Sequence, residues 1–216
     1  MPGAPRHVER KQLLDARALQ RALQRLAGAI RKAHPRRSEP VLVGIQTRGV
    51  PLARRLAALV EAGGGARLAV GTLDITLYRD DLTQIAAQPV IKRTDIPVSI
   101  DGRSVILVDD VLYTGRTVRA ALDQLIDFGR PARIELAVLV DRGHRELPIR
   151  ADYVGRTLAT ARDEAVQVLV REEDGRDEVL LHRKLAAAAA PKAAPGKAKP
   201  KPKAKRRPAS RRKARR

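Results

Sequence analysis

Hydrophobic residues recur along the chain with two spacings, one typical of helices and the other of buried strands. From 15 to 33, apolar residues return every three or four positions with Arg and Lys between them. This period predicts an amphipathic helix that ends near His34 and Pro35. The run 41–45, VLVGI, is short, apolar and rich in β-branched residues, as in a strand buried on both faces. A second helix is predicted from 51 to about 62.

The same alternation continues in the second half of the chain. The apolar runs 105–108 and 134–140 predict two more buried strands. Between them, apolar residues at helical spacing predict a helix from 117 to 128, which Gly129 and Pro131 end.

Three further segments have weaker patterns. Residues 67–77 are a strand candidate, and 165–181 suggest two short strands joined by a turn at Asp174 and Gly175. From 80 to 104 the sequence is polar, contains two prolines and lacks a long periodic run, which predicts a mobile excursion or a hairpin.

Strands that alternate with helices predict an α/β fold with a parallel sheet covered on both faces. Ligands of such sheets bind beyond the carboxyl ends of the strands. Three polar clusters, at 46–49, 109–117 and 141–145, directly follow predicted strands. We therefore expect these clusters to converge on one cleft.

The cluster with the most distinctive chemistry belongs to the stretch VILVDDVLYTGRT, residues 105–117. Asp109 and Asp110 suit a metal ion or sugar hydroxyls, whereas 114–117, TGRT, suits an anion at the start of a helix. Neither GxxxxGK[ST] nor GxGxxG is present in this stretch. The alternative is that the acids are solvated loop residues, helix caps or part of a phosphoacceptor domain.

Composition narrows the classes of protein. The 216 residues allow one α/β domain and an appendage, and the absence of Cys excludes disulfides and cysteine-based metal or nucleophile sites. Aromatic residues make up 2% of the chain, which argues against a stacking platform for single-stranded nucleic acid. No signal core and no apolar run of roughly 20 residues is present, so we expect a soluble, cytoplasmic protein without a membrane partner.

The net charge of +20 is concentrated at the C-terminal end. Residues 186–216 carry 13 Lys and Arg and no acid, which leaves 31 basic and 24 acidic residues, or +7, for residues 1–185. The Lys/Ala/Pro/Arg composition predicts a disordered tail that contacts nucleic acid non-specifically through phosphates. A solubilising extension or one attracted to a membrane surface is the alternative.

VILVDDVLYTGRT resembles the phosphoribosyl pyrophosphate (PRPP) signature of type I phosphoribosyltransferases. The stretches DITLYRDDL and DRGHRELPIRADYVGR resemble the family that combines pyrimidine-operon regulation with uracil phosphoribosyltransferase activity. The similarity covers roughly residues 8 to 183. It implies an α/β type I phosphoribosyltransferase fold, with a central, mostly parallel sheet flanked by helices, a flexible loop and a small hood. The implied domains are a phosphoribosyltransferase domain, 1–185, and the tail, 186–216.

The resemblance also implies roles for particular residues. Asp109 and Asp110 would hold the ribose hydroxyls, directly or through Mg²⁺, and Arg48 would act with them in catalysis. The turn at Arg48 would grip pyrophosphate, 113–117 would cradle the 5′-phosphate, and the excursion would close over PRPP. The residues expected to bind PRPP or uridine monophosphate (UMP) are Thr47, Arg48, Gly49, Tyr78, Arg79, Lys92, Asp109, Asp110, Val111, Leu112, Tyr113, Thr114, Gly115, Arg116 and Thr117.

The base would be a pyrimidine, because Tyr113 stands where related purine enzymes carry a third acid before the Thr-Gly pair. The residues expected at uracil and its ribose are Asp141, Arg142, Gly143 and Val166, and the candidates for RNA contact are His144 and Arg145. Plainer interpretations are that Thr47 and Gly49 only form a turn, and that 79–81 and 144–145 are solvated loop charges.

The resemblance thus implies an enzyme that forms UMP and pyrophosphate from uracil and PRPP with Mg²⁺. It also implies a UMP-responsive regulator of pyrimidine genes that binds an mRNA leader, and a homodimer or larger homo-oligomer. One alternative is an RNA-binding attenuation regulator with little or no catalytic role. Another is a vestigial fold whose tail binds nucleic acid. The intact pair Asp109 and Asp110 favours the enzyme.

Overall fold

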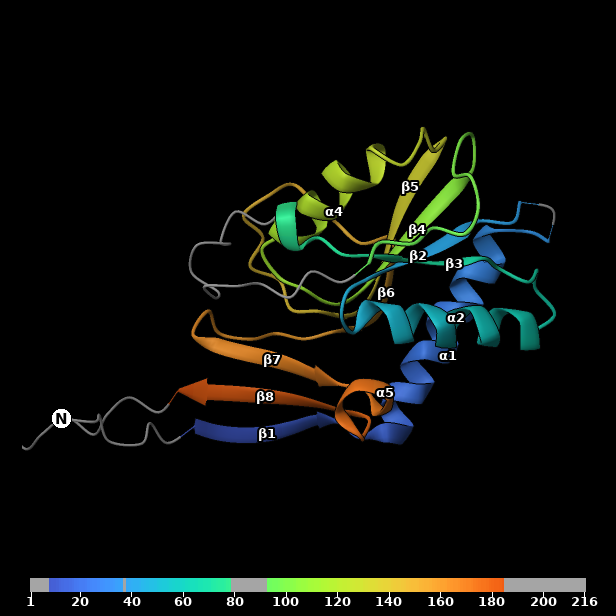
Figure 1. Cartoon of the computed structure of the whole chain (residues 1–216). Coiled ribbons are helices and arrows are strands. Elements are labelled where there is room, and N and C mark those ends of the chain that lie inside the picture. Colours follow the sequence, from blue (N-terminus) through green and yellow to red (C-terminus); the bar gives the residue numbers. More distant parts are fainter. Residues whose placement is uncertain (1–7, 37, 79–92, 185–216) are drawn as a thin grey trace, which may run out of the picture. The chain divides into compact units, whose positions relative to one another are not determined.

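Five parallel strands form the central sheet of the protein (Figure 1). The structure is a computed structural model that describes residues 8–36, 38–78 and 93–184. In spatial order the strands are β3 (Val70–Leu73), β2 (Val41–Ile45), β4 (Ser104–Leu112), β5 (Arg133–Asp141) and β6 (Tyr153–Thr157). The predicted strand 41–45 has the bounds of β2, and the predicted strands 105–108 and 134–140 lie within β4 and β5.

Helices cover both faces of this sheet, as the alternation of elements predicted (Figure 1). Helices α1 (Ala16–Ala33) and α2 (Gly49–Ala62) pack on one face, and α4 (Arg116–Ile126) packs on the other. Successive strand side chains point to opposite faces. Ile106 accordingly belongs to the core under α1 and α2, whereas its neighbour Leu107 belongs to the core under α4.

The amphipathic helix predicted from 15 to 33 is confirmed as α1. The carboxylate of Asp15 caps its start by accepting a hydrogen bond from the backbone N–H of Ala18 at 2.7 Å. Its apolar residues at helical spacing, among them Leu19 and Ile30, are fully buried. The helix ends at Ala33 with His34 as its C-cap, before Pro35, which lacks the N–H needed to continue it.

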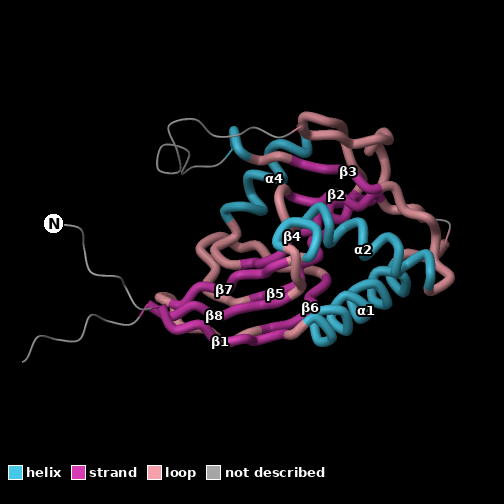
Figure 2. Tube along the Cα trace, turned by 60° about the horizontal axis from the view of Figure 1, so that its bottom comes forward, coloured by secondary structure: helices cyan, strands magenta, loops and turns pink. Residues whose placement is uncertain are grey.

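A small antiparallel sheet, here called the hood together with helix α5, forms a second sheet that packs against the core under α1 and α2 (Figure 2). Its strands, in the order β1 (Val8–Leu14), β8 (Glu178–Lys184) and β7 (Glu164–Leu169), join the two ends of the described chain. The two predicted strands of 165–181 are β7 and β8. Helix α5 (Arg171–Asp174) lies between them, and Gly175 follows with a φ of 74°.

Some predicted boundaries were wrong. The strand expected at 67–77 is only the four-residue β3, and the short 3-10 helix η1 (Thr76–Tyr78) follows. The carboxylate of Asp74 accepts hydrogen bonds from the backbone N–H and the hydroxyl of Thr76, at 3.0 and 2.5 Å, and this turn ends the strand. Helices α2 and α4 begin slightly earlier than predicted, at Gly49 and Arg116.

Parts of the remaining predictions lie outside the described residues. This holds for most of the polar excursion, since 79–92 are not described, and for the tail 186–216. The domain boundary after residue 185 therefore stays a prediction. Within the described part of the chain, no helix has the length and apolar character to span a bilayer.

A buried phenol makes the stability of this fold change with pH in the alkaline range. Tyr153 is 7% exposed and its hydroxyl donates to Glu135 Oε2 at 3.3 Å. Burial and the charge of Glu135 raise the pKa of Tyr153 to about 12. In the unfolded chain its pKa is about 10, so the free energy of unfolding should fall between about pH 10 and 12 as only the unfolded state releases this proton.

A Tyr153→Phe variant should lose this part of the pH dependence. Urea unfolding of both proteins at a series of pH values from about 8 to 11 measures it. Identical pH slopes for the two proteins would contradict the assignment to Tyr153.

Candidate active site

The three polar clusters do follow adjacent strands at one edge of the sheet. Residues 46–49, 109–117 and 141–145 come at the carboxyl ends of β2, β4 and β5, which are neighbours in the sheet. The loops also contact one another directly. A Cβ on Gly49 would lie 2.3 Å from the carbonyl oxygen of Val108, and the backbone N–H of Arg142 donates to Leu112 at 3.1 Å. The candidate site therefore lies at the carboxyl ends of the strands, as the sequence pattern predicted.

The first loop contributes the cation Arg48. Gly49 is needed here because no larger residue would fit against β4, and this close approach fixes the backbone next to Arg48. The peptide between Gln46 and Thr47 is cis. The Arg48 guanidinium makes a bidentate pair with Asp174, with Nε donating at 3.0 Å and Nη2 at 2.8 Å. The hydrogen bond to Asp174 raises the pKa of Arg48, and the charge of Asp110 adds to the shift.

The two predicted acids lie at the end of β4. Asp109 is 6% exposed, and its Oδ1 accepts the backbone N–H of Asp110 at 2.9 Å. Oδ1 of Asp110 accepts the N–H of Val111 at 2.8 Å. Burial raises the pKa of Asp110, while its contact with Asp109 and the positive charge of Arg48 oppose the shift. The arrangement presents negative charge beside a fixed cation.

Val111 and Leu112 continue strand β4 instead of forming a loop. Val111 packs against the core under α1 and α2, and Leu112 is buried in the core under α4. The carbonyl of Leu112 accepts hydrogen bonds from the backbone N–H of Arg142 and from Nη1 of Arg145. The side chains of Val111 and Leu112 thus support the site from the core, and a contact with substrate stays a prediction.

The second loop has the geometry of an anion site. Gly115 has a φ of 94°, a left-handed conformation that glycine adopts without strain, and α4 begins at the next residue. The hydroxyl of Thr114 accepts the N–H of Arg116 at 3.3 Å, while its carbonyl accepts the N–H of Glu146 at 2.9 Å. The start of α4, including Thr117, offers backbone N–H groups and the positive end of the helix dipole. This arrangement suits a phosphate.

The side chain of Arg116 is turned to a neighbouring loop. It is exposed, and its Nε donates to Glu146 at 2.8 Å. Arg116 therefore contributes its backbone to the helix start, and its guanidinium joins the 113–117 turn to the segment after β5.

The third loop packs its side chains around Tyr113. The guanidinium carbon of Arg142 lies 4.2 Å from the Tyr113 ring centroid, and the His144 ring meets the same ring edge-on at 6.1 Å. Arg142 is 5% exposed, and its Nη2 donates to the carbonyl of Ala161 at 2.9 Å. Its Nε is buried without a hydrogen-bond partner among the described residues.

His144 and Arg145 are tied to their own loop. The carboxylate of Asp141 accepts the N–H of Gly143 at 2.9 Å and pairs with Arg145 at 2.6 Å. Arg145 also donates to the carbonyls of Leu112, Tyr113, Gly143 and Ile149. His144 has a φ of 60°, and its Nε2 lies 2.6 Å from the carbonyl oxygen of Thr160. These bonds give both residues a structural role, and RNA contact stays a prediction.

The predicted residue Tyr78 lies away from this cluster, and Val166 belongs to the hood. The hydroxyl of Tyr78 donates to Asp127 at 2.6 Å, at the end of α4 opposite Gly115 and about 16 Å away along the helix. Val166 pairs with Leu181 in the hood, and it is half-buried against the same core as Val111. Arg79 and Lys92 lie outside the described residues.

Sequence reasoning missed the contribution of Asp174. Its position before Gly175 correctly indicated a turn, but no local signal connects it with Arg48, which lies 126 positions earlier. A lone acid in a turn is more often a solvated cap than part of a site.

Parallel strands, an acid pair at a strand end and an anion site at the following helix define this protein as a phosphoribosyltransferase. A family model described as phosphoribosyl transferase domain matches residues 9–171. The chain is 57% identical over 173 residues to the bifunctional protein PyrR of Chloroflexus aurantiacus, which covers 80% of this chain and 95% of that protein. The bifunctional protein PyrR of Thermus aquaticus is 56% identical over 176 residues, covering 82% and 97%. The chain belongs to the family of bifunctional PyrR proteins.

Solved structures with the same fold include hypoxanthine phosphoribosyltransferases. That of Trypanosoma cruzi has a TM-score of 0.59 at 19% identity and covers 81% of this chain and 97% of its own. That of Staphylococcus aureus has a TM-score of 0.58 at 23% identity and covers 79% and 90%. The predicted resemblance and the predicted type I phosphoribosyltransferase fold are confirmed. The predicted function, a uracil phosphoribosyltransferase of a bifunctional family, agrees with the PyrR relatives.

Proposed function

We propose that the protein transfers the phosphoribosyl group of PRPP to uracil and releases UMP and pyrophosphate. The observation that carries this proposal is the grouping of Arg48, Asp110 and the Gly115 turn at the ends of adjacent strands. These groups suit, in turn, the pyrophosphate, the ribose and the 5′-phosphate of one PRPP molecule. Membership in the PyrR family supports the same reaction.

In this reaction the bond from the anomeric carbon to pyrophosphate breaks, and a bond from that carbon to a ring nitrogen of uracil forms. The nitrogen loses its proton to solvent or to the departing pyrophosphate. Positive charge grows on the ribose in the transition state, next to the acids, and negative charge grows on pyrophosphate, which Arg48 contacts in this proposal. Catalysis then depends on positioning and charge, and no protein nucleophile is required.

The proposed base is uracil. Tyr113 takes the position at which the purine enzymes of the resemblance carry an acid, and its ring contacts Arg142 and His144. A phenol in this place offers no carboxylate to a purine ring. Asp141, Arg142, Gly143 and Val166 remain the proposed uracil contacts.

Mg²⁺ is proposed to enter with PRPP. Among the described residues there is no group of three or more His, Cys, Asp or Glu that would enclose a metal ion. The chain offers the pair Asp109 and Asp110, whose carboxylates also accept backbone N–H groups. Two carboxylates fit Mg²⁺, which keeps waters and substrate phosphates as its other ligands. The ion would neutralise charge on pyrophosphate.

A direct assay tests the reaction. Purified protein, labelled uracil, PRPP and Mg²⁺ should yield UMP and pyrophosphate, whereas hypoxanthine or guanine should yield no nucleotide. Absence of UMP over a range of magnesium and PRPP concentrations would refute the enzymatic proposal.

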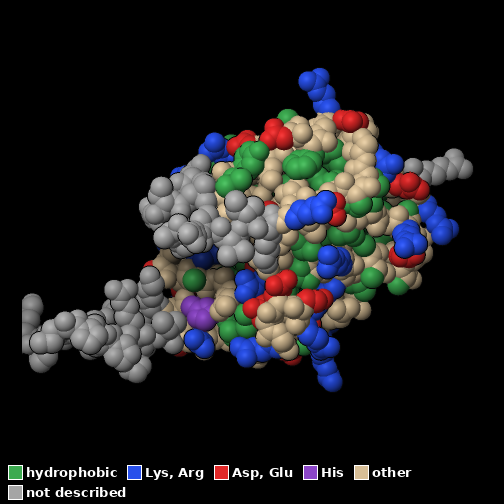
Figure 3. Space-filling model, in the orientation of Figure 1, with side chains coloured by type: hydrophobic (Ala, Val, Ile, Leu, Met, Phe, Trp, Pro, Cys, Tyr) green, Lys and Arg blue, Asp and Glu red, His purple; other side chains and the backbone are tan. Residues whose placement is uncertain are grey.

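The second proposed function is UMP-responsive binding of a pyrimidine mRNA leader. The bifunctional names of the relatives favour it. Figure 3 shows Lys and Arg side chains directly beside acidic ones on the face that includes α5, so this face is not a continuous basic surface. Titrating leader RNA with and without UMP decides the matter, since a regulator should change affinity with UMP. An affinity that UMP does not alter, at both low and moderate salt, would contradict this function.

Deleting residues 186–216 should weaken binding to RNA and DNA and reduce its salt dependence. Up to 13 cationic contacts are removed, and each phosphate that they neutralise contributes roughly one unit to the salt slope. Uracil phosphoribosyltransferase activity should stay close to that of the full chain, because every proposed site residue precedes the tail.

A full-length variant with the 13 Lys and Arg of this segment changed to Gln is the matched control, because it keeps the length and removes the charge. Salt slopes equal to those of the unmodified chain would show that the tail does not touch nucleic acid. A loss of enzyme activity on deletion would show that the proposed boundary after residue 185 is misplaced.

We also propose a homodimer or larger assembly in the cytoplasm, which light scattering on purified protein and localisation of a tagged chain can test.

A further inference from the structure

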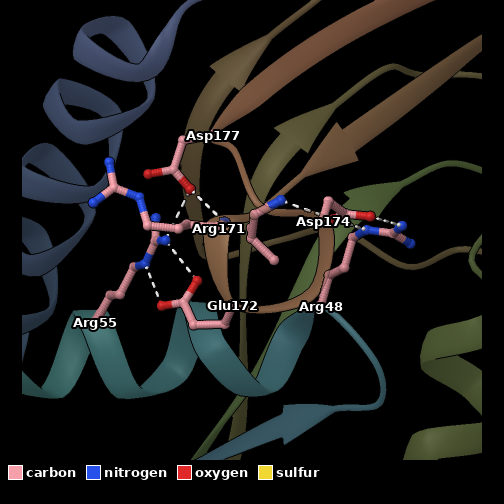
Figure 4. A network of polar contacts seen from close by, with 7 residues as sticks. Arg48, Arg55, Arg171, Glu172, Asp174 and Asp177 are labelled. Atoms are coloured by element: carbon pink, nitrogen blue, oxygen red, sulfur yellow. Dashed lines mark hydrogen bonds and ion pairs between the residues drawn. The ribbon is translucent and has the colours of Figure 1, made fainter.

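Two arginines of one helix face are held by carboxylates of the hood (Figure 4). Arg48 directly precedes α2, and Arg55 follows seven positions later, about two helical turns along the same side. Arg55 pairs with Glu172 at 2.6 Å and with Asp177 at 2.8 Å. Arg48 pairs with Asp174 alone among the described residues. The ion pairs of Arg55, here called the Arg55 clamp, therefore join the hood to α2. The ion pair of Arg48 joins the hood to a residue of the candidate site.

Asp174 is fixed within the hood before it meets Arg48. Its Oδ2 accepts the backbone N–H of Val170 at 2.9 Å as well as Nε of Arg48 at 3.0 Å, while Oδ1 accepts Nη2 at 2.8 Å. The carboxylate side chain is 17% exposed. A carboxylate that is held by its own backbone can orient a flexible partner.

The guanidinium is held by one edge, and its other edge is open. Asp174 engages the edge formed by Nε and Nη2. Nη1 of Arg48 has no hydrogen-bond partner in the described part of the chain, and the side chain is 31% exposed. The edge formed by Nη1 and Nη2 can therefore bind a phosphate in bidentate fashion while Asp174 stays bound. Asp174 and an anion need not compete for Arg48.

The Arg48 guanidinium lies in the electrostatic field of Asp110. Gly49 holds the backbone beside Arg48 against β4, and the negative charge of Asp110 acts on the guanidinium. Fixing an arginine side chain in advance removes an entropic penalty that ligand binding would otherwise carry, about 0.5–1.5 kcal/mol per immobilised side chain. The contact with Asp174 thus prepares Arg48 for a ligand next to the proposed ribose site.

We propose that Asp174 is a positioning residue for the pyrophosphate group of PRPP, which it serves by orienting the Arg48 guanidinium. The proposal rests on the proposed phosphoribosyl transfer and adds a hood residue to its machinery. Asp174 acts through Arg48 and does not itself contact the substrate. The Arg55 clamp has no such role and only fastens the hood to α2.

The test compares Asp174→Asn with Asp177→Asn in the full chain. Both remove one charge from a hood clamp, but only the first disturbs Arg48. The KM for PRPP and the inhibition constant of pyrophosphate should rise about 3- to 10-fold in Asp174→Asn, the loss expected for one side chain that is no longer pre-oriented. The KM for uracil should change little. Asp177→Asn should leave all three constants within about twofold of the unmodified chain.

A double-mutant cycle with Arg48→Ala tests whether Asp174 acts through Arg48. In the Arg48→Ala background, Asp174→Asn should have no further effect on the KM for PRPP. An additional loss there, equal effects of Asp174→Asn and Asp177→Asn, or unchanged constants in Asp174→Asn would overturn the proposal. Tighter PRPP binding by Asp174→Asn would also overturn it, because Asp174 would then compete with pyrophosphate.

A second variant and a binding measurement keep the test decisive if Asp174→Asn does not fold or if the proposed reaction does not occur. If Asp174→Asn does not fold, Asp174→Glu keeps the charge and displaces the carboxylate by one methylene, with the same expected rise in KM. Calorimetric titration with magnesium pyrophosphate measures the same difference without turnover. An unmodified chain that binds pyrophosphate but forms no UMP would refute the proposed function, while the comparison of variants would still decide the role of Asp174.

Discussion

Asp110→Asn should lower the turnover of UMP formation at least about tenfold and leave the fold intact. A tenfold loss corresponds to about 1.4 kcal/mol of transition-state stabilisation, a modest value for a charge placed beside a developing oxocarbenium ion. The amide keeps the size of the carboxylate, and its oxygen can still accept the backbone N–H of Val111. Steady-state kinetics at saturating PRPP and Mg²⁺, with thermal unfolding alongside, measure the effect.

The pH dependence of kcat/KM should reflect the ionisation of Asp110. Burial raises the pKa of Asp110, so in the free enzyme its ionised form should be lost at a higher pH than for an ordinary Asp. If the ionised form is active, kcat/KM should fall as the pH decreases through this raised pKa, and the Asn variant should lack that limb. Asp123→Asn, at an exposed position of α4, controls for the loss of a charge. Unchanged kinetics in Asp110→Asn would remove the residue from the mechanism.

Arg48→Ala should lower kcat/KM for PRPP by about 10- to 100-fold, because hydrogen bonds to charged groups contribute about 1.5–3 kcal/mol. Both KM and kcat should change, since the same guanidinium would bind the substrate pyrophosphate and stabilise it as the leaving group. Initial rates over a range of PRPP concentrations separate the two constants. A normal KM together with normal turnover would exclude Arg48 from the site.

The structure supplies a matched control for this change. Arg55→Ala removes the neighbouring clamp to Glu172 and Asp177 on the same side of α2, so it reports how far the loosened hood alone affects catalysis. Arg48→Lys is a second comparison, because lysine keeps the charge but cannot make the bidentate contact with Asp174. A loss in Arg55→Ala as large as in Arg48→Ala would assign the effect to the hood and not to a pyrophosphate contact.

The central layers and the middle of the candidate site could be predicted from local patterns in the chain. The strand 41–45 and helix α1 could be predicted because hydrophobic spacing and end signals, such as Asp15 and Pro35, act over a few residues. The stretch 105–117 contains its strand, its acids and its helix start in one continuous segment. Since carboxyl ends of parallel strands meet at one edge, the grouping of three polar clusters followed from their order along the chain.

The hood and its contact with the candidate site could not be predicted from local patterns, because both depend on contacts between distant segments. Strand β1 has no clear alternation, and it forms because it pairs with β8, with Glu9 opposite Arg183. Strand propensity depends strongly on such partners, which lie far away in the sequence. For the same reason, the contact between Arg48 and Asp174 and the hydrogen bond from Tyr78 to Asp127 could not be predicted from the sequence. A local pattern shows which residues are apolar, acidic or small, but which side chain each charged group meets is set by packing between distant segments.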